Sequence, residues 1–317
     1  MGGIRVGICS WTDRTLLKSG FYPASASNPA GRLAYYASRF DAVEIDSTYY
    51  ALADSLSAFR WVGGTPGDFK FGVKSFGIFT FHRVKFAALP GWLKSELGGG
   101  PPGAAVRRED LTHGQRVKLF EEFIKPIEIL RSAGKLAYLL FQFPPGWRFG
   151  AEGLAYLRRI REISGPMPLA VEVRNNSWLD ARNRHQFLDV LADQNIAYTA
   201  VDEPAIGWTA PPEWPVTAEW GTVVRFHGRN SAGWQNPKAT VQERFDYEYS
   251  RPELAGWAER AKKLQEDSSA DRQMFLMFNN CVSDKAVRGA CLMREMLGIG
   301  PGHQGGFQRG LGFPDGG

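Results

Sequence analysis

The sequence predicts a single-domain α/β protein folded as a (β/α)8 TIM barrel. Eight short runs of β-branched or aromatic residues recur along the 317-residue chain, each bounded by turn signals. Stretches with helical periodicity separate most of these runs, in the order that an eight-stranded parallel barrel requires. A doubly wound open sheet would alternate in the same way, so alternation by itself leaves that second arrangement open.

The predicted strands are almost continuously apolar, as expected of strands that are buried on both faces of a parallel sheet. They span residues 4–9, 42–46, 70–74, 136–142, 169–174, 197–202, 223–227 and 274–279. Asn28 and Pro29 supply a cap and a first-turn proline for the first helix. Apolar residues spaced three and four apart predict further helices over residues 117–130, 154–163, 187–191, 254–264 and 287–297. Residues 203–221 contain several prolines, which disfavour a helix, so the sixth βα unit is expected to be a long irregular loop.

Glycine is concentrated in two segments, residues 91–103 and 298–317. Outside these segments its content is ordinary for a globular protein. We therefore expect one barrel domain over residues 1–297, with a flap inserted after the third strand at about residues 76–115. Residues 298–317 are expected to form a flexible tail.

Composition excludes several classes of protein. The chain carries 38 Lys and Arg against 33 Asp and Glu, a net charge of +5, and it lacks an apolar run long enough to span a membrane. Cys9, Cys281 and Cys291 are widely spaced, which favours a reducing, cytoplasmic location. Neither a phosphate-binding loop nor a GxGxxG motif follows a strand, so no nucleotide cofactor is predicted. Because no apolar run is long enough to span a membrane, no membrane partner is predicted either. The oligomeric state stays open.

Charged and polar residues gather where the predicted strands end. Side chains alternate along a strand between the barrel interior and the helix layer, and apolar neighbours place these charges inside. The pattern predicts inward side chains for three pairs of residues: Glu44 and Asp46, Glu172 and Arg174, and Arg225 and His227. Other strands end in Lys74, Gln142, Asp202 and Asn279. Buried charges are costly unless they are paired.

Two interpretations of these charges follow. In the first, they form salt bridges that fill the barrel. In the second, Lys74, Arg174 and Arg229 bind a small anionic or sugar-like ligand beside His227, and Glu172 transfers protons with Asp46 as its partner and Glu44 beside it. A binding barrel without chemistry is a further alternative.

Residues of metal-binding type and aromatic residues lie at or after the same strand ends. Glu44, Asp46, Glu172, Asp202 and His227 include metal-ligand types, but with one inward histidine a divalent metal is the less favoured choice and no cofactor is predicted. Aromatic residues follow the same strands and can stack on sugar rings or nucleobases. They are Trp11, Tyr49, Tyr50, Phe143, Trp147, Trp178, Trp208, Trp234, Tyr247 and Tyr249, from which Trp11, Tyr49 and Trp178 are taken as ligand contacts.

Five motifs resemble, in order, those of the YecE-like family, number 72 in the series of domains of unknown function. The motifs are VEIDSTYY at 43–50, LLFQFPP at 139–145, AVEVR at 170–174, VRFHGRN at 224–230 and FNN at 278–280. The resemblance runs from about residue 4 to residue 297. It implies a TIM barrel and no established reaction, cofactor or catalytic residue.

The sequence departs from that family's usual pattern at three positions. Asp46 stands where the family usually has asparagine, and Asn175 and Cys281 stand where it has histidine, whereas Trp11 and Trp178 keep the family's aromatic positions. The loss of histidines weakens a metal-based or histidine-based mechanism, and Asp46 adds a carboxylate. Because inward carboxylates face basic and aromatic side chains, we expect an enzyme, a hydrolase or an isomerase or lyase, that acts on a phosphorylated, sugar-like or glycosidic substrate. Nucleic-acid binding, by analogy of fold with endonuclease IV-like barrels, is the alternative.

Overall fold

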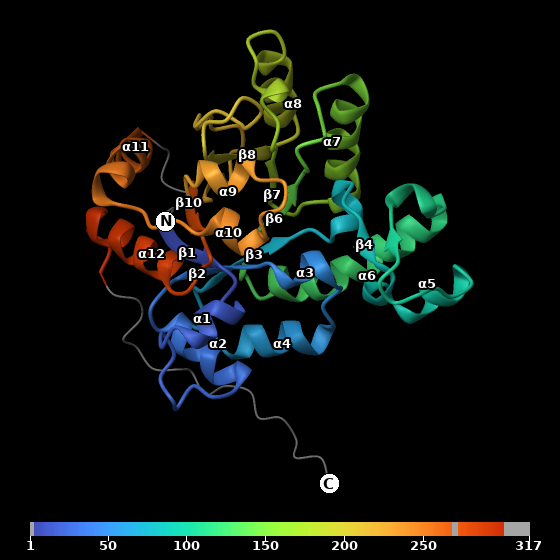
Figure 1. The fold of residues 1–317 in the computed structure, drawn as a ribbon, viewed down its shortest axis with the longest axis horizontal. Helices are drawn as coiled ribbons and strands as arrows, with labels where there is room; N and C mark the ends of the chain where they lie inside the picture. Colours follow the sequence, from blue (N-terminus) through green and yellow to red (C-terminus); the bar gives the residue numbers. More distant parts are fainter. Residues whose placement is uncertain (1–2, 268–271, 301–317) are drawn as a thin grey trace.

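The computed structural model shows a closed barrel of eight parallel strands (Figure 1). It describes residues 3–267 and 272–300. Around the barrel the strands follow the order β1, β2, β3, β6, β7, β8, β9 and β10, and β10 pairs with β1 to close the ring. Their bounds are Ile4–Cys9, Ala42–Ile45, Lys70–Lys74, Leu136–Gln142, Leu169–Glu172, Ile196–Asp202, Gly221–Phe226 and Gln273–Phe278. The predicted fold is therefore confirmed, and an open sheet is ruled out.

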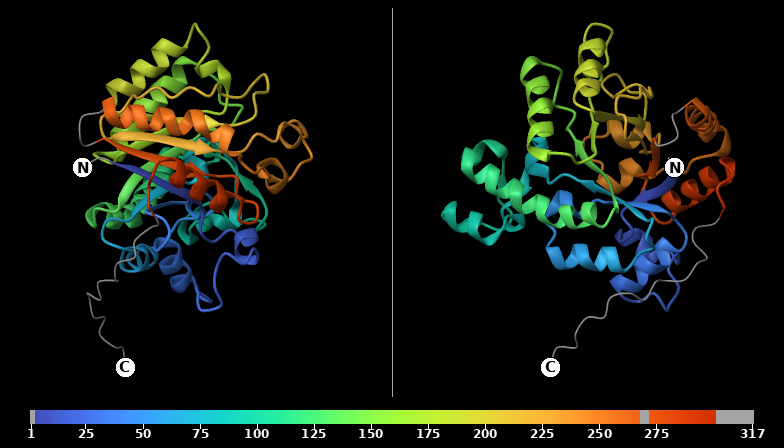
Figure 2. Two further views of the ribbon diagram at one scale, coloured as in Figure 1. Left: turned by 90° about the vertical axis from the view of Figure 1, so that its left-hand side faces the viewer. Right: turned by 180° about the vertical axis from the view of Figure 1, so that it is seen from behind.

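Helices surround the strands, with α7 and α8 on one side of the barrel and α2 and α4 on the opposite side (Figure 2). Asn28 caps α2 as predicted, because its side chain accepts a hydrogen bond of 2.8 Å from the Gly31 amide. Helix α4 (Ser55–Gly63) was not predicted; it is short and leaves Leu56 and Phe59 exposed. The helices are α1 (Arg14–Lys18), α2 (Pro29–Ala37), α3 (Ser47–Tyr50), α4 (Ser55–Gly63), α6 (His113–Ser132), α7 (Ala151–Ser164), α8 (Arg184–Asp193), α9 (Ser231–Gln235), α10 (Val241–Phe245), α11 (Arg251–Asp267) and α12 (Lys285–Met296).

The segment between β3 and α6 contains secondary structure of its own. Strands β4 (Val84–Lys85) and β5 (Ala105–Val106) form a two-stranded antiparallel sheet, and α5 (Gly91–Glu96) lies between them in the chain. Short 3-10 turns stand at Gly77–Thr80, Phe86–Ala88 and Arg108–Asp110. The movement of this segment as a flap stays a prediction. Most of the predicted tail, residues 301–317, lies outside the described residues.

The sixth βα unit is irregular, as its prolines predict. Residues 203–220 contain no helix, and side chains tie them to the barrel instead. The Thr217 hydroxyl accepts a hydrogen bond of 2.7 Å from the Tyr198 amide, and the Trp214 indole donates one of 2.7 Å to Thr222. The segment thus covers strands β8 and β9 where a helix would otherwise lie.

The core has two layers. The larger lies between strands and helices, and the smaller lies inside the barrel, where Tyr138, Val223, Phe275 and Met277 are buried together. Charged side chains lie above this inner cluster, towards the carboxyl ends of the strands. Within the described residues, no helix is both long and apolar enough to cross a bilayer.

Candidate functional site

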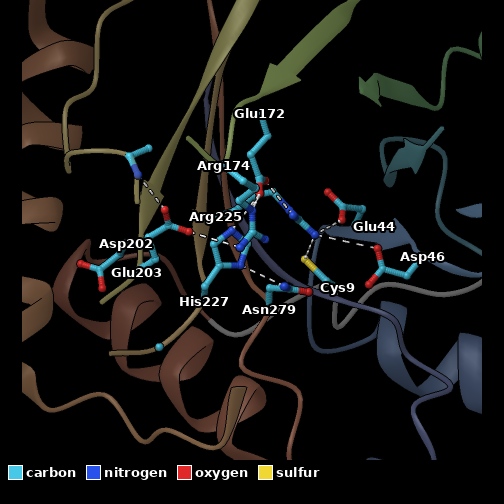
Figure 3. A network of polar contacts seen from close by, with 12 residues as sticks. Cys9, Glu44, Asp46, Glu172, Arg174, Asp202, Glu203, Arg225, His227 and Asn279 are labelled. Atoms are coloured by element: carbon cyan, nitrogen blue, oxygen red, sulfur yellow. Dashed lines mark hydrogen bonds and ion pairs between the residues drawn. The ribbon is translucent and has the colours of Figure 1, made fainter. Parts of the chain in front are cut away.

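Arg225 on β9 is the centre of a buried charge network inside the barrel (Figure 3). Its Nη1 donates to Oε2 of Glu172 at 2.7 Å, and its Nη2 donates to Oε1 of Glu44 at 2.6 Å. All three side chains are fully buried. Since β2, β7 and β9 are not neighbours in the barrel, these contacts cross its interior and confirm the predicted inward direction. A buried guanidinium between two carboxylates supplies the pairing that buried charges require.

Arg174 carries the network towards the barrel mouth. Its Nε donates to Oε1 of Glu172, and its Nη1 lies 3.2 Å from Oε2 of Glu203. The other oxygen of Glu203 accepts a hydrogen bond of 3.0 Å from the Ala210 amide. The guanidinium of Arg174 also lies over the ring of Trp234, 5.4 Å from its centroid. Arg174 is therefore held on one side by carboxylates and on the other by an indole.

His227 is a neutral imidazole with a defined tautomer. The side-chain amide nitrogen of Asn279, which can only donate, lies 2.9 Å from Nδ1 of His227. The proton therefore resides on Nε2, which donates to Oε1 of Glu172 at 3.1 Å. Burial, with the charge of Arg174 beside it, lowers the pKa of His227 to about 3. His227 thus orients Glu172 and carries no charge at neutral pH.

The buried carboxyl groups differ in their protonation. Burial opposes ionisation of Glu172, but Arg174, Arg225 and His227 outweigh it and hold its pKa well below the usual range. For Glu44, burial and the neighbouring Asp46 raise the pKa to about 7 against the opposing effect of Arg225. Burial likewise raises the pKa of Glu203 to about 7. Glu172 is therefore ionised at neutral pH, whereas Glu44 and Glu203 titrate near it.

A cavity of about 1030 Å³ opens above this network at the mouth of the barrel. Six of the predicted site residues line it: Asp46, Tyr49, Lys74, Gln142, Arg174 and Asn279. Lys74 rests over the ring of Tyr49, with its Nζ 4.6 Å from the centroid. Within the described part of the chain, the Lys74 ammonium and the Gln142 amide make no hydrogen bond or ion pair with protein groups. These groups are free to bind a ligand.

Glu44, Glu172 and His227 do not line the cavity. They are fully buried, one layer deeper than Asp46, Arg174 and Asn279. The predicted salt-bridge interpretation therefore describes the deeper layer, and the predicted ligand-binding interpretation remains available for the upper one.

Trp11 and Trp178 lie in the packing between strands and helices. Trp11 packs edge-on against Trp61 at 6.2 Å. Trp178 stacks on Trp147 at 4.2 Å and donates its indole N–H to the Trp147 carbonyl at 2.8 Å. Both indoles are buried, and neither reaches the cavity, because the turns that carry them fold back against the helix layer.

Asp202 and Arg229 form a clamp at the side of the barrel. Asp202 accepts two hydrogen bonds from Arg229, at 2.8 and 2.6 Å, and one each from Tyr249 and Trp257. Hydrogen bonding to Asp202 raises the pKa of Arg229. The pair borders a second cleft of about 1050 Å³, and neither residue lines the mouth cavity. The acceptors of Asp202 are thus used within the protein.

Several cavity-lining residues were not among the predicted ligand contacts. Trp208 and Trp234 stack at 6.0 Å, and both had been noted as aromatic residues after strands. Cys9 and Cys281 meet because β1 pairs with β10, which the sequence spacing does not show. Others include Thr12, Asp13, Arg14, Arg244 and Phe245. No group of three histidine, cysteine or carboxylate side chains in residues 3–267 and 272–300 is arranged to hold a metal ion.

Comparison with known proteins identifies relatives over nearly the whole chain. Residues 5–308 match the family model described as "Protein of unknown function DUF72". The UPF0759 protein YunF of Bacillus subtilis (strain 168) is 30% identical over 300 residues, which cover 93% of this chain and 95% of that protein.

Solved structures give the same result. A DUF72 family protein of Enterococcus faecalis V583 superposes with a TM-score of 0.75 at 25% identity, covering 94% of this chain and 96% of that one. A DUF72 family protein of Thermotoga maritima MSB8 gives a TM-score of 0.71 at 29% identity, covering 93% and 99%. The chain therefore belongs to the DUF72 family of proteins of unknown function.

Proposed function

We propose that this protein is an enzyme that binds a small phosphorylated, sugar-like substrate at the barrel mouth and transfers a proton to or from it through Asp46. The observation that carries the proposal is that a lysine and a carboxylate line the same cavity. The Lys74 ammonium rests over the Tyr49 ring and makes no hydrogen bond or ion pair within the described residues. Asp46 faces Arg225 at 3.8 Å through its buried Oδ1, and its side chain is 21% exposed. A lysine with unused donors and a partly exposed carboxylate at one cavity are suited to bind and protonate a ligand.

The charge of the lining favours an anion. Arg14, Lys74, Arg174 and Arg244 face Asp13 and Asp46, so four cations against two carboxylates give 4 − 2 = +2. Lys74 is the strongest candidate for binding a phosphate, since Arg174 is already paired with Glu172 and Glu203. Gln142 and Asn279 can bond to hydroxyl groups, and Tyr49 and Trp234 offer faces on which a sugar ring can stack.

Asp46 is the carboxylate best placed for proton transfer. Its side chain is 21% exposed and faces the cavity, whereas Glu172 is fully buried beneath Arg174 and kept ionised. We therefore assign Glu172 a positioning role, in which it holds Arg174 and His227, and place the acid or base function on Asp46.

Phosphate binding tests the anion site. Inorganic phosphate should bind the wild-type protein in a calorimetric titration, and Lys74→Met should weaken binding by about tenfold or more, since a charge-assisted contact is worth about 1.5–3 kcal/mol. Lys262→Met, which removes an exposed lysine from α11, is the matched control and should bind as wild type. Equal binding by both variants would remove Lys74 from the site.

Turnover tests the role of Asp46. Among sugar phosphates screened with the wild-type protein, any substrate that is converted should react about 10²-fold or more slowly with Asp46→Asn, the usual contribution of general acid–base catalysis. Asp189→Asn, an exposed change on α8, should react normally. Undiminished turnover by Asp46→Asn would contradict the assignment.

Nucleic-acid binding is the second candidate, favoured by the stacked Trp208 and Trp234 beside Arg244 at the cavity. A titration with single-stranded DNA at several salt concentrations decides it. Binding through phosphates would weaken steeply with salt, and binding without a salt dependence, or none at low salt, would exclude it.

A further inference from the structure

Glu44 and Asp46 form a close carboxyl pair at the end of β2. Glu44 lies in β2, Asp46 is the first residue after it, and both side chains point inward to Arg225. Both face one atom, Nη2 of Arg225, which lies 2.6 Å from Oε1 of Glu44 and 3.8 Å from Oδ1 of Asp46. Figure 3 shows the two carboxyl groups side by side at this end of Arg225.

The hydrogen bonds of the pair leave one oxygen without a donor. Arg225 donates to one oxygen of Glu44, and the Tyr138 hydroxyl donates to the other at 3.0 Å. Oδ1 of Asp46 is buried and accepts no hydrogen bond from any described donor. A buried acceptor left in this way is costly, and a proton placed between the two carboxyl groups would satisfy it.

Within the described residues, Arg225 is the cation that forms ion pairs with the two carboxyl groups. Arg225 is shared with Glu172, and Lys74 is the other cation near Glu44. The remaining titratable groups that face the pair are neutral or acidic: Cys9 on β1, Asp13 before α1, Tyr50 on α3, Tyr138 on β6 and Cys281 after β10. Burial raises the pKa of both thiols and of the Tyr138 phenol, so these groups add no positive charge.

We infer that Glu44 and Asp46 share one proton at neutral pH, and that this is the proton which Asp46 donates at the mouth. The inference rests on the proposed function for its second half. Two carboxyl groups in one buried site resist double ionisation, so one of them retains a proton. The pKa of Glu44, raised to about 7 by burial and by Asp46, agrees with this geometry.

The shared proton moves to Oδ2 of Asp46, the oxygen other than the buried Oδ1, and passes from there to an oxygen of the bound substrate. The pair then consists of two carboxylates facing Arg225. Water returns a proton to the pair after product leaves. Glu44 does not touch the substrate and acts as a positioning residue that keeps the proton available.

Infrared titration of the protein without substrate tests the shared proton. The carbonyl band of a protonated carboxyl group should be present at pH 6 and titrate near pH 7. Glu44→Gln and Asp46→Asn should each remove this component, about one proton per chain. Glu203→Gln should remove a separate component, and Glu121→Gln, an exposed change on α6, should remove none.

Two variants keep the test decisive if one fails to fold. Survival of the component in Glu44→Gln, or an unchanged midpoint in Asp46→Asn, would overturn the inference. The phosphate titration separates this result from the proposed function. Loss of phosphate binding with the expected infrared behaviour would remove the anion site alone, whereas phosphate binding with an unaltered band would remove the shared proton alone.

Discussion

Two layers of polar side chains lie one above the other at the same end of the barrel, and they differ in what their atoms are doing. In the lower layer, Arg225 and His227 both donate hydrogen bonds to Glu172. In the upper layer Lys74 and Gln142 make none within the described residues. The step from lower to upper layer is two residues from Glu44 to Asp46 and from Glu172 to Arg174. Polar residues at strand ends therefore mark a ligand site only where their hydrogen-bond donors and acceptors remain unused.

The largest difference between the layers should appear in stability. Arg225→Met leaves Glu44 buried without its ion-pair partner and removes one of the two arginines paired with Glu172, and it should lower the free energy of unfolding by about 3–5 kcal/mol. Urea unfolding measures this change. Arg288→Met, which removes an exposed arginine paired with Asp284 and Glu248, should cost about 0–1 kcal/mol. A cost below about 1 kcal/mol for Arg225→Met would show that the lower layer is not held by charge pairing.

Aromatic residues likewise include some that are buried in the core and some that line the cavity. Trp178 is buried and stacked, so Trp178→Ala should cost about 3–5 kcal/mol of stability. Trp208 lies at the cavity and is only partly buried, so Trp208→Ala should cost clearly less. Unfolding in urea compares the two variants directly, and similar costs would contradict the assignment of Trp178 to the core and Trp208 to the cavity.

A smaller effect is expected from the pH dependence of Glu203. Its pKa is raised from 4.5 to about 7, so the folded state binds more protons than the unfolded state between these values. Its contribution to stability is therefore complete below pH 4.5 and is lost as pH rises through 7, by about 3 kcal/mol in total.

Glu203→Gln is the variant that isolates this contribution. The difference in unfolding free energy between wild type and variant should fall over that range of pH. His82 and His227, whose pKa values are lowered by burial to about 4 and about 3, lose their contribution as pH falls below 6.5, but they are present in both proteins and cancel. A difference that does not change with pH would show that Glu203 is ionised throughout.

The barrel itself could be predicted because buried parallel strands are apolar on both faces, and the predicted strands agree with the observed ones to within two residues. The inward direction of Glu44, Glu172 and Arg225 followed from the alternation of side chains along each strand. The complete burial of Glu172 and His227 did not follow from it. Whether an inward residue reaches solvent depends on what covers it, and Arg174, two residues after the end of β7, covers Glu172.

Other features of the site depend on contacts between distant segments. Trp208 and Trp234 meet because the loops after β8 and β9 pack together, and no local pattern specifies that packing. Cys281 reaches the Cys9 carbonyl, 2.8 Å from its sulfur, because the last strand closes the ring against the first. Trp178 was expected at the ligand and lies in the core, since the turn after β7 folds back towards α8.

Tyr138 has a consequence for how this barrel can vary. Its hydroxyl supports Glu44, and its ring occupies the space above Gly72, where an added Cβ would lie 2.5 Å from the ring. A side chain at position 72 is therefore incompatible with tyrosine at position 138. Among relatives, these two positions should change together, with a larger residue at the first accompanied by a smaller one at the second. Where tyrosine is lost, the carboxyl group at position 44 should lose its hydroxyl donor and should be replaced as well.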